Sequence, residues 1–323
     1  MSGRVIVALA AWAVLSAAAA AQAQEFPSRP VRMVVPFVVG TPDAIARTLA
    51  AQLTGQVGQN VIVDNRAGAN GIIGAEVVAK SAPDGYTLLL TSASFVVNPS
   101  IYRKLPFNPL RDFTPISNVC TLEAFILTVP PALPAQTVKD LIALANKPGA
   151  KLAYASPGIG NTIHIAGALF SVRAGINMVH VPYKGGGPAV GALLGGEVQV
   201  MFANPPLALT LIQGGKLRAL GYTGTKRLAT LPNVPTMTEA GVQGMELDGG
   251  WFGLLGPAKI PPKVVDKLNR ETRAALENPQ VRERLLALGL DPAPTTSAQY
   301  KALLEREVKA YAELVRITGI KAD

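Results

Sequence analysis

The residues Val31–Leu53 read VRMVVPFVVGTPDAIARTLAAQL. Their first part, VRMVVPF, is a compact run of β-branched and other apolar residues that predicts a buried strand. A helical pattern follows from Thr41, which is a favourable N-cap, with Pro42 suited to the first helical position and Asp43 to the helix dipole. The stretch therefore predicts a strand, a short loop and the start of a helix.

The same order of elements recurs along the chain. Further strands are predicted at 60–64, 86–91, 125–129, 151–155, 178–181, 198–202 and 217–222, and further helices at 71–80, 137–146, 161–173 and 188–194. Alternation at this spacing predicts an α/β fold with mainly parallel sheets flanked by helices. Because 323 residues exceed the size at which a single core usually stops growing, two lobes are expected.

The last part of the chain breaks the alternation. A short strand is predicted at 251–255, followed by a helical region over 264–288 that breaks at Asn278–Pro279, and by another helix over 297–317. These helices need an apolar surface to cover. One economical arrangement is that the chain crosses back to the first lobe.

The N-terminus has the pattern of an export signal. Arg4 is the only charged residue before Glu25, the residues Val5–Ala21 are almost all apolar, and Ala21–Ala23 form an A-x-A cleavage site. These features predict a signal peptide over residues 1–23, cleaved near Ala23, and a periplasmic location. The alternative is an uncleaved membrane anchor, since the apolar stretch approaches the ~20 residues that span a bilayer. The run of alanines and the A-x-A site favour cleavage.

Charge and cysteine content exclude several classes of protein. The formal net charge is +9, but no segment concentrates lysine and arginine as nucleic-acid-binding proteins do. We therefore expect no nucleic-acid partner and a cationic surface that attracts small anions. The single cysteine, Cys120, cannot form an internal disulfide and is expected to be a buried small hydrophobe.

Catalytic motifs are weak. The chain has two histidines, His164 and His180, and His164 follows the loop 156–162, so a Ser156/His164 pair is the one hydrolytic arrangement to test. The G-x-S-x-G motif is absent, because Tyr154 stands where its first glycine would be. His180 is interpreted as a structural histidine in a strand. Metal-binding and nucleotide-binding motifs are also missing, so no metal and no cofactor are expected.

Three loops of small residues connect strand ends to helix starts, at 38–43, 92–94 and 156–162. Such loops present backbone N–H groups at the positive end of a helix dipole, which suits a carboxylate or a phosphate. In open α/β sheets the ligand crevice lies at these strand ends. Each loop by itself can also be a tight turn, but three of them together favour a binding site.

Several longer motifs are typical of one family. They read FPSRPVR at 26–32, VVPF at 34–37, VDNRAGANG at 63–71, PDGYTLL at 83–89, HVPYKG at 180–185 and LPNVPT at 231–236. In these motifs, and in their order along the chain, the protein resembles the substrate-binding receptors of tripartite tricarboxylate transporters, also called Bug receptors.

The resemblance implies a periplasmic Venus-flytrap protein with two α/β lobes joined by hinge strands that cross near Ala124 and Gly250. Lobe 1 is then discontinuous, over 24–124 plus 250–323, and lobe 2 covers 125–249. It implies a solute-binding receptor and not an enzyme. Such a receptor captures a small carboxylate-bearing metabolite and delivers it to a membrane permease, or passes the signal to a sensor protein. A monomer is expected.

The resemblance also implies a binding site between the lobes. One ligand carboxylate is expected to lie between the first loop and the second-lobe loop, with the following residues: Phe37, Val38, Val39, Gly40, Thr41, Asp43, Ser156, Gly158, Gly160, Asn161, Thr162 and His164. Candidates for the more variable far end are Ser92, Ser94, Tyr183, Lys184, Asn204 and Trp251.

Two departures from the family pattern concern this site. The first loop usually reads P-F-P-P-G-G-G-T-D, whereas the residues Pro36–Asp43 are one residue shorter and include Pro42, which has no N–H to donate. An altered carboxylate geometry or weaker binding is expected. At position 204, where relatives often have aspartate, this chain has Asn204. An amide adds no negative charge, so we expect an anionic or neutral far end of the ligand rather than an ammonium group.

Overall fold

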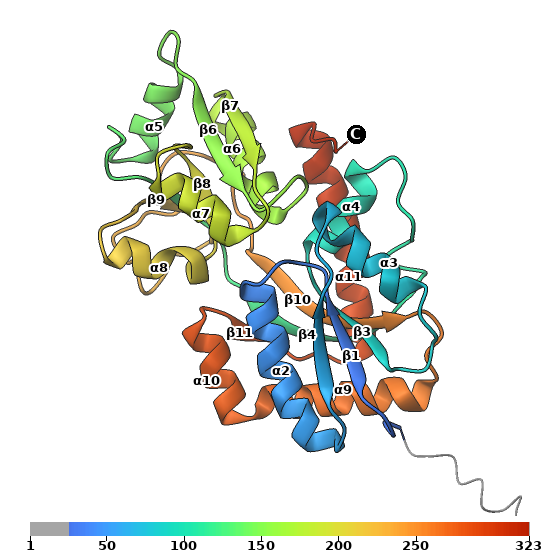
Figure 1. Cartoon of the computed structure of the whole chain (residues 1–323). Helices are drawn as coiled ribbons and strands as arrows, with labels where there is room; N and C mark the ends of the chain where they lie inside the picture. The colour runs from blue at the N-terminus through green and yellow to red at the C-terminus, as the bar shows by residue number, and fades with distance from the viewer. Residues whose placement is uncertain (1–25, 323) are drawn as a thin grey trace, which may run out of the picture.

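The computed structural model describes residues 26–322 and shows two α/β lobes (Figure 1). The signal peptide predicted over residues 1–23 lies outside the described part of the chain. No helix within residues 26–322 combines the length and the apolarity needed to cross a membrane.

The first lobe is built on a six-stranded sheet in the order β11-β4-β10-β3-β1-β2. Its strands are β1 (Val31–Val35), β2 (Val61–Asn65), β3 (Thr87–Ser92), β4 (Phe113–Leu122), β10 (Gly250–Pro257) and β11 (Asp291–Pro292). One face is covered by α2 (Thr41–Val57), α9 (Pro262–Glu277) and α10 (Pro279–Ala287). The other face is covered by α3 (Ile72–Ala79), α4 (Ser94–Ile101) and α11 (Ser297–Thr318), and a short 3₁₀ turn, η1 (Ala69–Gly71), precedes α3.

This two-sided cover explains why β1 has apolar residues that point to both faces of the sheet, with Arg32 as its one charged residue. Met33 and Val35 pack into the core under α2 and α9, whereas Val34 packs into the core on the opposite face. Successive side chains of a strand point to opposite faces, so a sheet buried on both sides needs apolar residues without alternation. The predicted break between the C-terminal helices is confirmed, because the Asn278 side chain caps α10 by accepting from the N–H groups of Gln280 and Val281.

The second lobe has one core under two small sheets. A three-stranded sheet has the order β8-β5-β9, and a two-stranded sheet pairs β6 with β7. These strands are β5 (Ile126–Val129), β6 (Leu152–Ser156), β7 (Met178–Pro182), β8 (Met201–Ala203) and β9 (Arg218–Tyr222). The helices are α5 (Val138–Ala145), α6 (Thr162–Ala174), α7 (Gly186–Leu194) and α8 (Pro205–Gln213). An isolated parallel bridge between Tyr154 and Val200 connects the two sheets.

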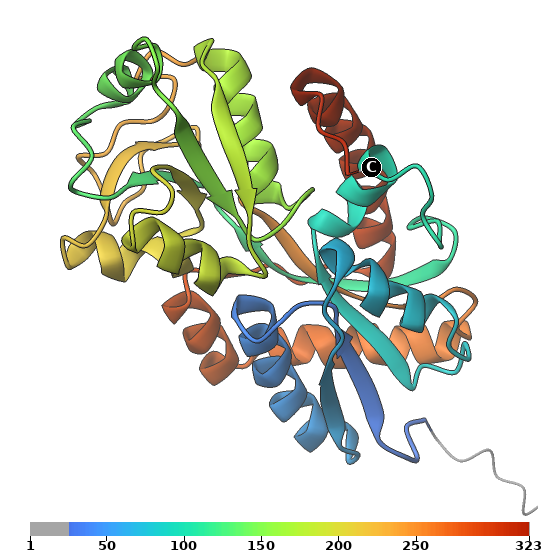
Figure 2. The same cartoon turned by 45° about the horizontal axis from the view of Figure 1, so that its top comes forward.

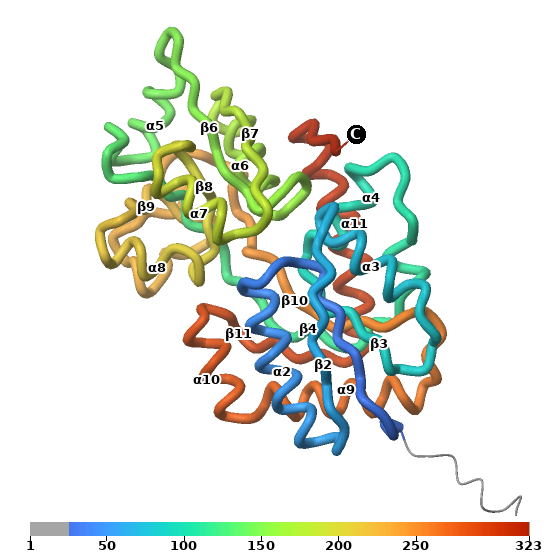
Figure 3. The backbone as a smooth tube through the Cα atoms, viewed as in Figure 1, coloured from blue at the N-terminus to red at the C-terminus, as the bar shows by residue number. Residues whose placement is uncertain are grey.

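The chain passes twice between the lobes, from β4 into β5 and from the end of lobe 2 into β10 (Figures 2 and 3). The lobe boundaries at 124/125 and 249/250 remain a prediction; β4 ends at Leu122, β5 begins at Ile126 and β10 begins at Gly250. The prediction of mainly parallel sheets needs correction. Strand β1 pairs in parallel with β2 and β3, and β6 with β7, but β10 is antiparallel to both β3 and β4, and β5 is antiparallel to β8 and β9. A strand that leaves a lobe and one that re-enters it run in opposite directions, so neighbouring crossing strands pair antiparallel.

Three of the longer elements were not predicted, namely β4, α4 and α8. In β4, the polar residues Ser117 and Asn118 hide the strand pattern, but both are buried. The hydroxyl of Ser117 donates to the carbonyl of Thr295 at 3.0 Å, and the Asn118 side chain donates to the carbonyl of Ala293. Cys120 in the same strand is fully buried, which confirms its interpretation as a small hydrophobe.

Candidate ligand-binding site

A cavity of about 650 Å³ lies between the two lobes. Lobe 1 contributes Pro36–Pro42, Ala67–Gly71, the end of β3 and the start of β10. Lobe 2 contributes the segment between β6 and α6, the segment between β7 and α7, and Asn204 and Leu207 from the start of α8. Strand ends from both lobes thus meet at one space, where a solute would contact both halves of the molecule.

Six helices begin at this cavity. The residues that precede them all line it, namely Gly40 before α2, Gly71 before α3, Ala93 before α4, Asn161 before α6, Gly185 before α7 and Asn204 before α8. Only the α6 terminus has a side-chain cap, from Asn161 to the N–H of Ile163, among these described termini. The positive ends of six helix dipoles therefore face one space, which favours a bound anion.

The charge of the cavity lining is positive, as are the helix N-termini. Among the lining residues that the structure describes, Lys184 has the only charged side chain, and it is exposed. No aspartate or glutamate occurs in that set. A cationic solute would find no counter-charge there, whereas a carboxylate would meet an ammonium group and the helix N-termini.

Comparison with known proteins identifies the family. The profile of the tripartite tricarboxylate transporter family receptor matches residues 45–320. The chain belongs to this receptor family. It is 38% identical to the protein BugT of Bordetella pertussis, over 94% of each chain. The solved structure of the periplasmic binding protein BugD is 35% identical, with a TM-score of 0.84, over 92% of this receptor and 99% of BugD.

A further solved structure contains a solute. It is that of R. palustris Rpa4515 with adipate, which is 33% identical to the receptor with a TM-score of 0.86, over 92% of the receptor and 99% of that chain. The predicted family and the predicted two-lobed periplasmic-binding fold are both confirmed, although the sheets are mixed. The protein is therefore a solute-binding receptor.

The structure divides the site residues predicted from the sequence into two groups. Those that line the cavity are Phe37, Val38, Val39, Gly40, Thr41, Ser92, Gly158, Asn161, Thr162, Tyr183, Lys184, Asn204 and Trp251. Those that lie outside the lining are Asp43, Ser94, Ser156, Gly160 and His164. Direct contact of any of these residues with a ligand remains a prediction.

The residues outside the lining support it from behind. The Asp43 carboxylate is buried and accepts from Nε of Arg47 at 2.9 Å, one helical turn further along α2. Ser94 is fully buried, and its Oγ accepts from Nδ2 of Asn161 at 3.3 Å. Because Ser94 belongs to lobe 1 and Asn161 to lobe 2, this hydrogen bond connects the lobes beside the cavity.

The Ser156/His164 pair, the one hydrolytic arrangement that the sequence left to test, is not present. Oγ of Ser156 lies 2.7 Å from Nε2 of His180, while Nδ1 of His164 accepts from the N–H of Gly160 at 3.0 Å. In the register of β6 against β7, His180 lies opposite Tyr154, so Ser156, two residues further along β6, points to the same face of the sheet as His180. Ser156 Oγ also lies 2.9 Å from the carbonyl oxygen of Gly158 and is fully buried, so its role here is to hold the loop before α6.

The two imidazoles stack on each other, with ring centroids 3.6 Å apart and an angle of 7° between the planes. Burial, together with the charge that His180 would carry, lowers the pKa of His164 to about 3. Burial also lowers the pKa of His180 to about 4. Both rings are therefore neutral at physiological pH, which allows them to stack at van der Waals distance.

Acidification is expected to destabilise the receptor through this pair. Both pKa values are lower than the ordinary 6.5, so the unfolded chain binds more protons as the pH falls. The stabilisation is complete above about pH 6.5 and is lost as the pH falls toward 4. Lowering the pH from 7 to 5 should reduce the free energy of unfolding by about 2 kcal/mol per histidine. Urea denaturation at the two pH values measures this loss.

The matched variant is His180→Gln, which keeps a polar side chain that does not titrate. Its loss of stability between pH 7 and pH 5 should be smaller than that of the wild type by about 2 kcal/mol. Carboxylates titrate equally in both proteins and cancel in this difference. Equal losses would show that the histidine pair does not control the acid sensitivity.

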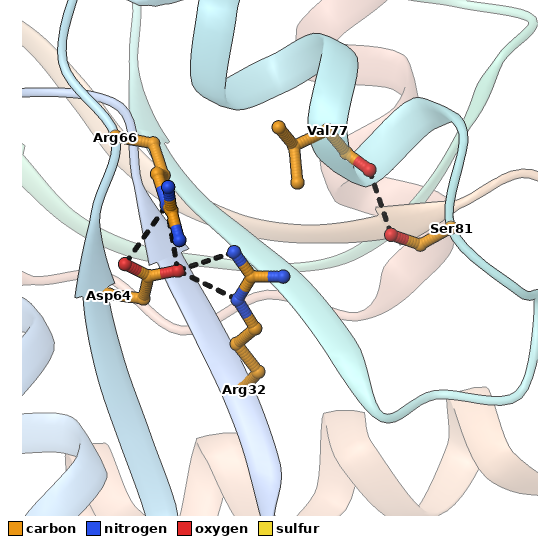
Figure 4. A network of polar contacts seen from close by, with 5 residues as sticks. All are labelled: Arg32, Asp64, Arg66, Val77 and Ser81. Carbon is orange, nitrogen blue, oxygen red and sulfur yellow. Dashed lines mark hydrogen bonds and ion pairs between the residues drawn. The ribbon is translucent and has the colours of Figure 1, made fainter.

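A salt-bridge network holds the lobe 1 loops in place (Figure 4). The Asp64 carboxylate accepts from Nε of Arg32 at 2.8 Å and from Nε of Arg66 at 3.1 Å. Burial opposes ionisation of Asp64, but the hydrogen bonds from the two arginines outweigh it and lower the pKa. Next to it, Nδ2 of Asn65 donates to the carbonyl of Phe37 at 3.2 Å. The end of β2 therefore positions both loops that lobe 1 contributes to the cavity.

The sequence did not identify every lining segment as part of the site. The loop Ala67–Gly71 was recognised as a family motif but not as a lining segment, and Gly186, Gly187 and Leu207 were also missed. In this loop Ala69 and Asn70 both have positive φ, of 46° and 49°. Non-glycine residues in this conformation are often found at functional sites. The signal was available, because this loop also joins a strand end to a helix start.

Proposed function

We propose that this receptor is exported to the periplasm, captures a small carboxylate-bearing solute between its lobes and delivers it to a membrane permease. The convergence of six helix N-termini on one cavity carries this proposal. The lining, with Lys184 and without acidic residues among the described ones, supports it. So does the adipate in the structure of the relative Rpa4515.

We further propose that the protein acts as a monomer and not as an enzyme. A hydrolase needs a nucleophile that faces the substrate. Ser156 is buried, lies outside the cavity lining and is hydrogen-bonded within its own loop. The hypothesis that Asn204 disfavours ammonium groups gains support from the absence of an acidic side chain among the described lining residues.

The test is a ligand screen of the mature chain, residues 24–323, with monocarboxylates, dicarboxylates and the matching amides. A solute at a hundredfold excess over its Kd stabilises the folded state by about 2.7 kcal/mol. Carboxylates should raise the melting temperature, whereas amides should not. Stabilisation by amides or by amines alone, or by nothing in the screen, would contradict the proposal.

A sensory receptor is the alternative to a transport receptor, and both use the same fold. Uptake of the identified solute by vesicles that contain a permease of the tripartite tricarboxylate type distinguishes them. A transport receptor should increase uptake in proportion to its saturation with solute. A sensor should leave the uptake unchanged.

Lys184→Gln is expected to weaken carboxylate binding about tenfold. The substitution removes the one charged side chain in the described lining, and a charge-assisted hydrogen bond contributes roughly 1.5–3 kcal/mol. Calorimetric titration measures the change in Kd, and the affinity of the variant should also depend less on salt. Lys151→Gln is the control, because Lys151 is exposed and lies outside the lining. Equal affinities of the two variants would exclude Lys184 as a contact.

A further inference from the structure

The first-lobe loop presents two valine side chains to the cavity. Val38 is 41% exposed and Val39 is 76% exposed, and both belong to the lining. Most other valines of lobe 1 are buried in its two cores. Two adjacent exposed valines at the opening of a cavity form an apolar surface that a solute could cover.

Apolar groups of the second lobe lie opposite this surface. A Cβ placed on Gly185 would be 2.8 Å from Cγ2 of Val38, so the valine reaches across to the start of α7. A Cβ on the next residue, Gly186, would be 2.9 Å from Cδ1 of Leu207. Val38, the two glycines and Leu207 therefore form a continuous apolar strip that spans both lobes.

Hydrogen-bond donors are unevenly distributed around the cavity. Helix α8, which carries Leu207, begins with Pro205 and Pro206, whereas α2 and α7 each have one proline among their first three residues, Pro42 and Pro188. The first turn of α6 contains no proline. Because proline has no N–H, the cavity is richer in donors where α6 begins than where α8 begins.

The charge of the lining and the volume of the cavity both favour a solute with one carboxylate. Lys184 offers one counter-charge among the described lining residues, which is enough for one carboxylate. The cavity of about 650 Å³ corresponds to roughly 20 water volumes, far more than a carboxylate fills. A second carboxylate placed against the valine strip would lose its hydration without a partner.

We propose that the solute is an amphipathic monocarboxylate, with one carboxylate and an apolar body that covers Val38, Val39 and Leu207. This inference rests on the proposed receptor function and specifies the chemical class of its ligand. The carboxylate lies toward the start of α6 and Lys184, and the apolar body lies along the strip.

The test is a homologous series of linear acids, titrated calorimetrically into the mature receptor. From butanoate to hexanoate to octanoate, affinity should rise about fourfold per methylene, because each buried methylene contributes about 0.8 kcal/mol. Hexanoate should bind more tightly than adipate, which has the same number of carbons. Tighter binding of adipate, or an affinity independent of chain length, would overturn the inference while leaving the receptor function intact. If no acid of either class binds, the receptor proposal fails as well.

The double variant Val38→Ser, Val39→Ser tests the residues themselves. It should flatten the dependence on chain length to less than twofold per methylene, with little change for butanoate. Val179→Ser is the control, because Val179 is 59% exposed in β7 but lies outside the cavity lining. An unchanged dependence in the double variant would exclude the valine strip as the site of the apolar body.

Discussion

Replacement of Gly160 by alanine is expected to weaken solute binding about 30-fold. A Cβ at this position would lie 2.0 Å from Cδ1 of Ile101 and 3.0 Å from Nδ2 of Asn70. Both neighbours belong to lobe 1, whereas Gly160 belongs to lobe 2, so the clash arises only when the lobes approach each other as they do here. Overpacking of a buried contact costs about 1–3 kcal/mol, and a cost of about 2 kcal/mol on closure corresponds to about 30-fold in Kd.

Gly160 also has a φ of 77°, a conformation that alanine adopts only at a cost. Gly175→Ala is the control for this cost, because Gly175 has a φ of 63° and a Cβ added to it would meet no atom within 4 Å. This control should lose stability by about 1 kcal/mol and keep its affinity. The additional substitution Ile101→Val removes the methyl group nearest the new Cβ and should restore most of the binding. Normal affinity of Gly160→Ala alone would mean that the solute does not require this approach of the lobes.

The substitution Gly253→Ala is expected to reduce the unfolding free energy of lobe 1 by about 3 kcal/mol or more. A Cβ on Gly253 would lie 2.0 Å from Oη and 2.3 Å from Cζ of Tyr300. Neither partner can move aside. Gly253 lies in β10, which is paired on both edges, and Tyr300 is fully buried with its ring 5.5 Å from that of Trp251. Urea denaturation followed by circular dichroism measures the loss.

Two further variants identify Tyr300 as the cause. Gly191→Ala in α7 adds the same methyl group where no atom lies within 4 Å, and it should stabilise the protein by up to about 1 kcal/mol. Tyr300→Phe removes Oη, which has no hydrogen-bond partner among the described residues, and should be nearly neutral. Combined with Gly253→Ala, it should recover part of the lost stability. Independent effects of the two substitutions would show that the methyl group does not press on Tyr300.

Much of the fold could be predicted from local patterns. The run Val31–Val35 predicted a strand, and Thr41–Asp43 predicted the start of α2, because these patterns depend on neighbours in the chain. The expected N-cap was wrong, since Gly40 precedes the helix without a side-chain cap and Thr41 is its first residue. Strand β4 escaped prediction, because its buried polar residues are satisfied by the segment 293–295, which is distant in sequence. The periodicity of a segment contains no information about a hydrogen-bond partner that is distant in the sequence.

The candidate site, like the fold, could be predicted only in part. Loops between strands and helices predicted the region, and most of the named residues line the cavity. The partner of Ser156 is His180 and not His164, which was the pairing to test, because the register of β6 against β7 brings His180 to its hydroxyl. The burial of Asp43, Ser94 and His164 behind the lining could not be predicted either, since it depends on how neighbouring helices pack.

The sequence by itself determined that this protein has two α/β lobes with loops suited to an anion, because these properties follow from composition and periodicity. Its receptor role was implied by the resemblance of its longer motifs to one family. Only the tertiary structure decided which helix starts share one cavity, that Val38 reaches Gly185 across it, and that Gly160 meets Ile101. These pairs are separated by many residues in the chain. Their distances depend on how the two lobes are joined, and no local pattern contains that information.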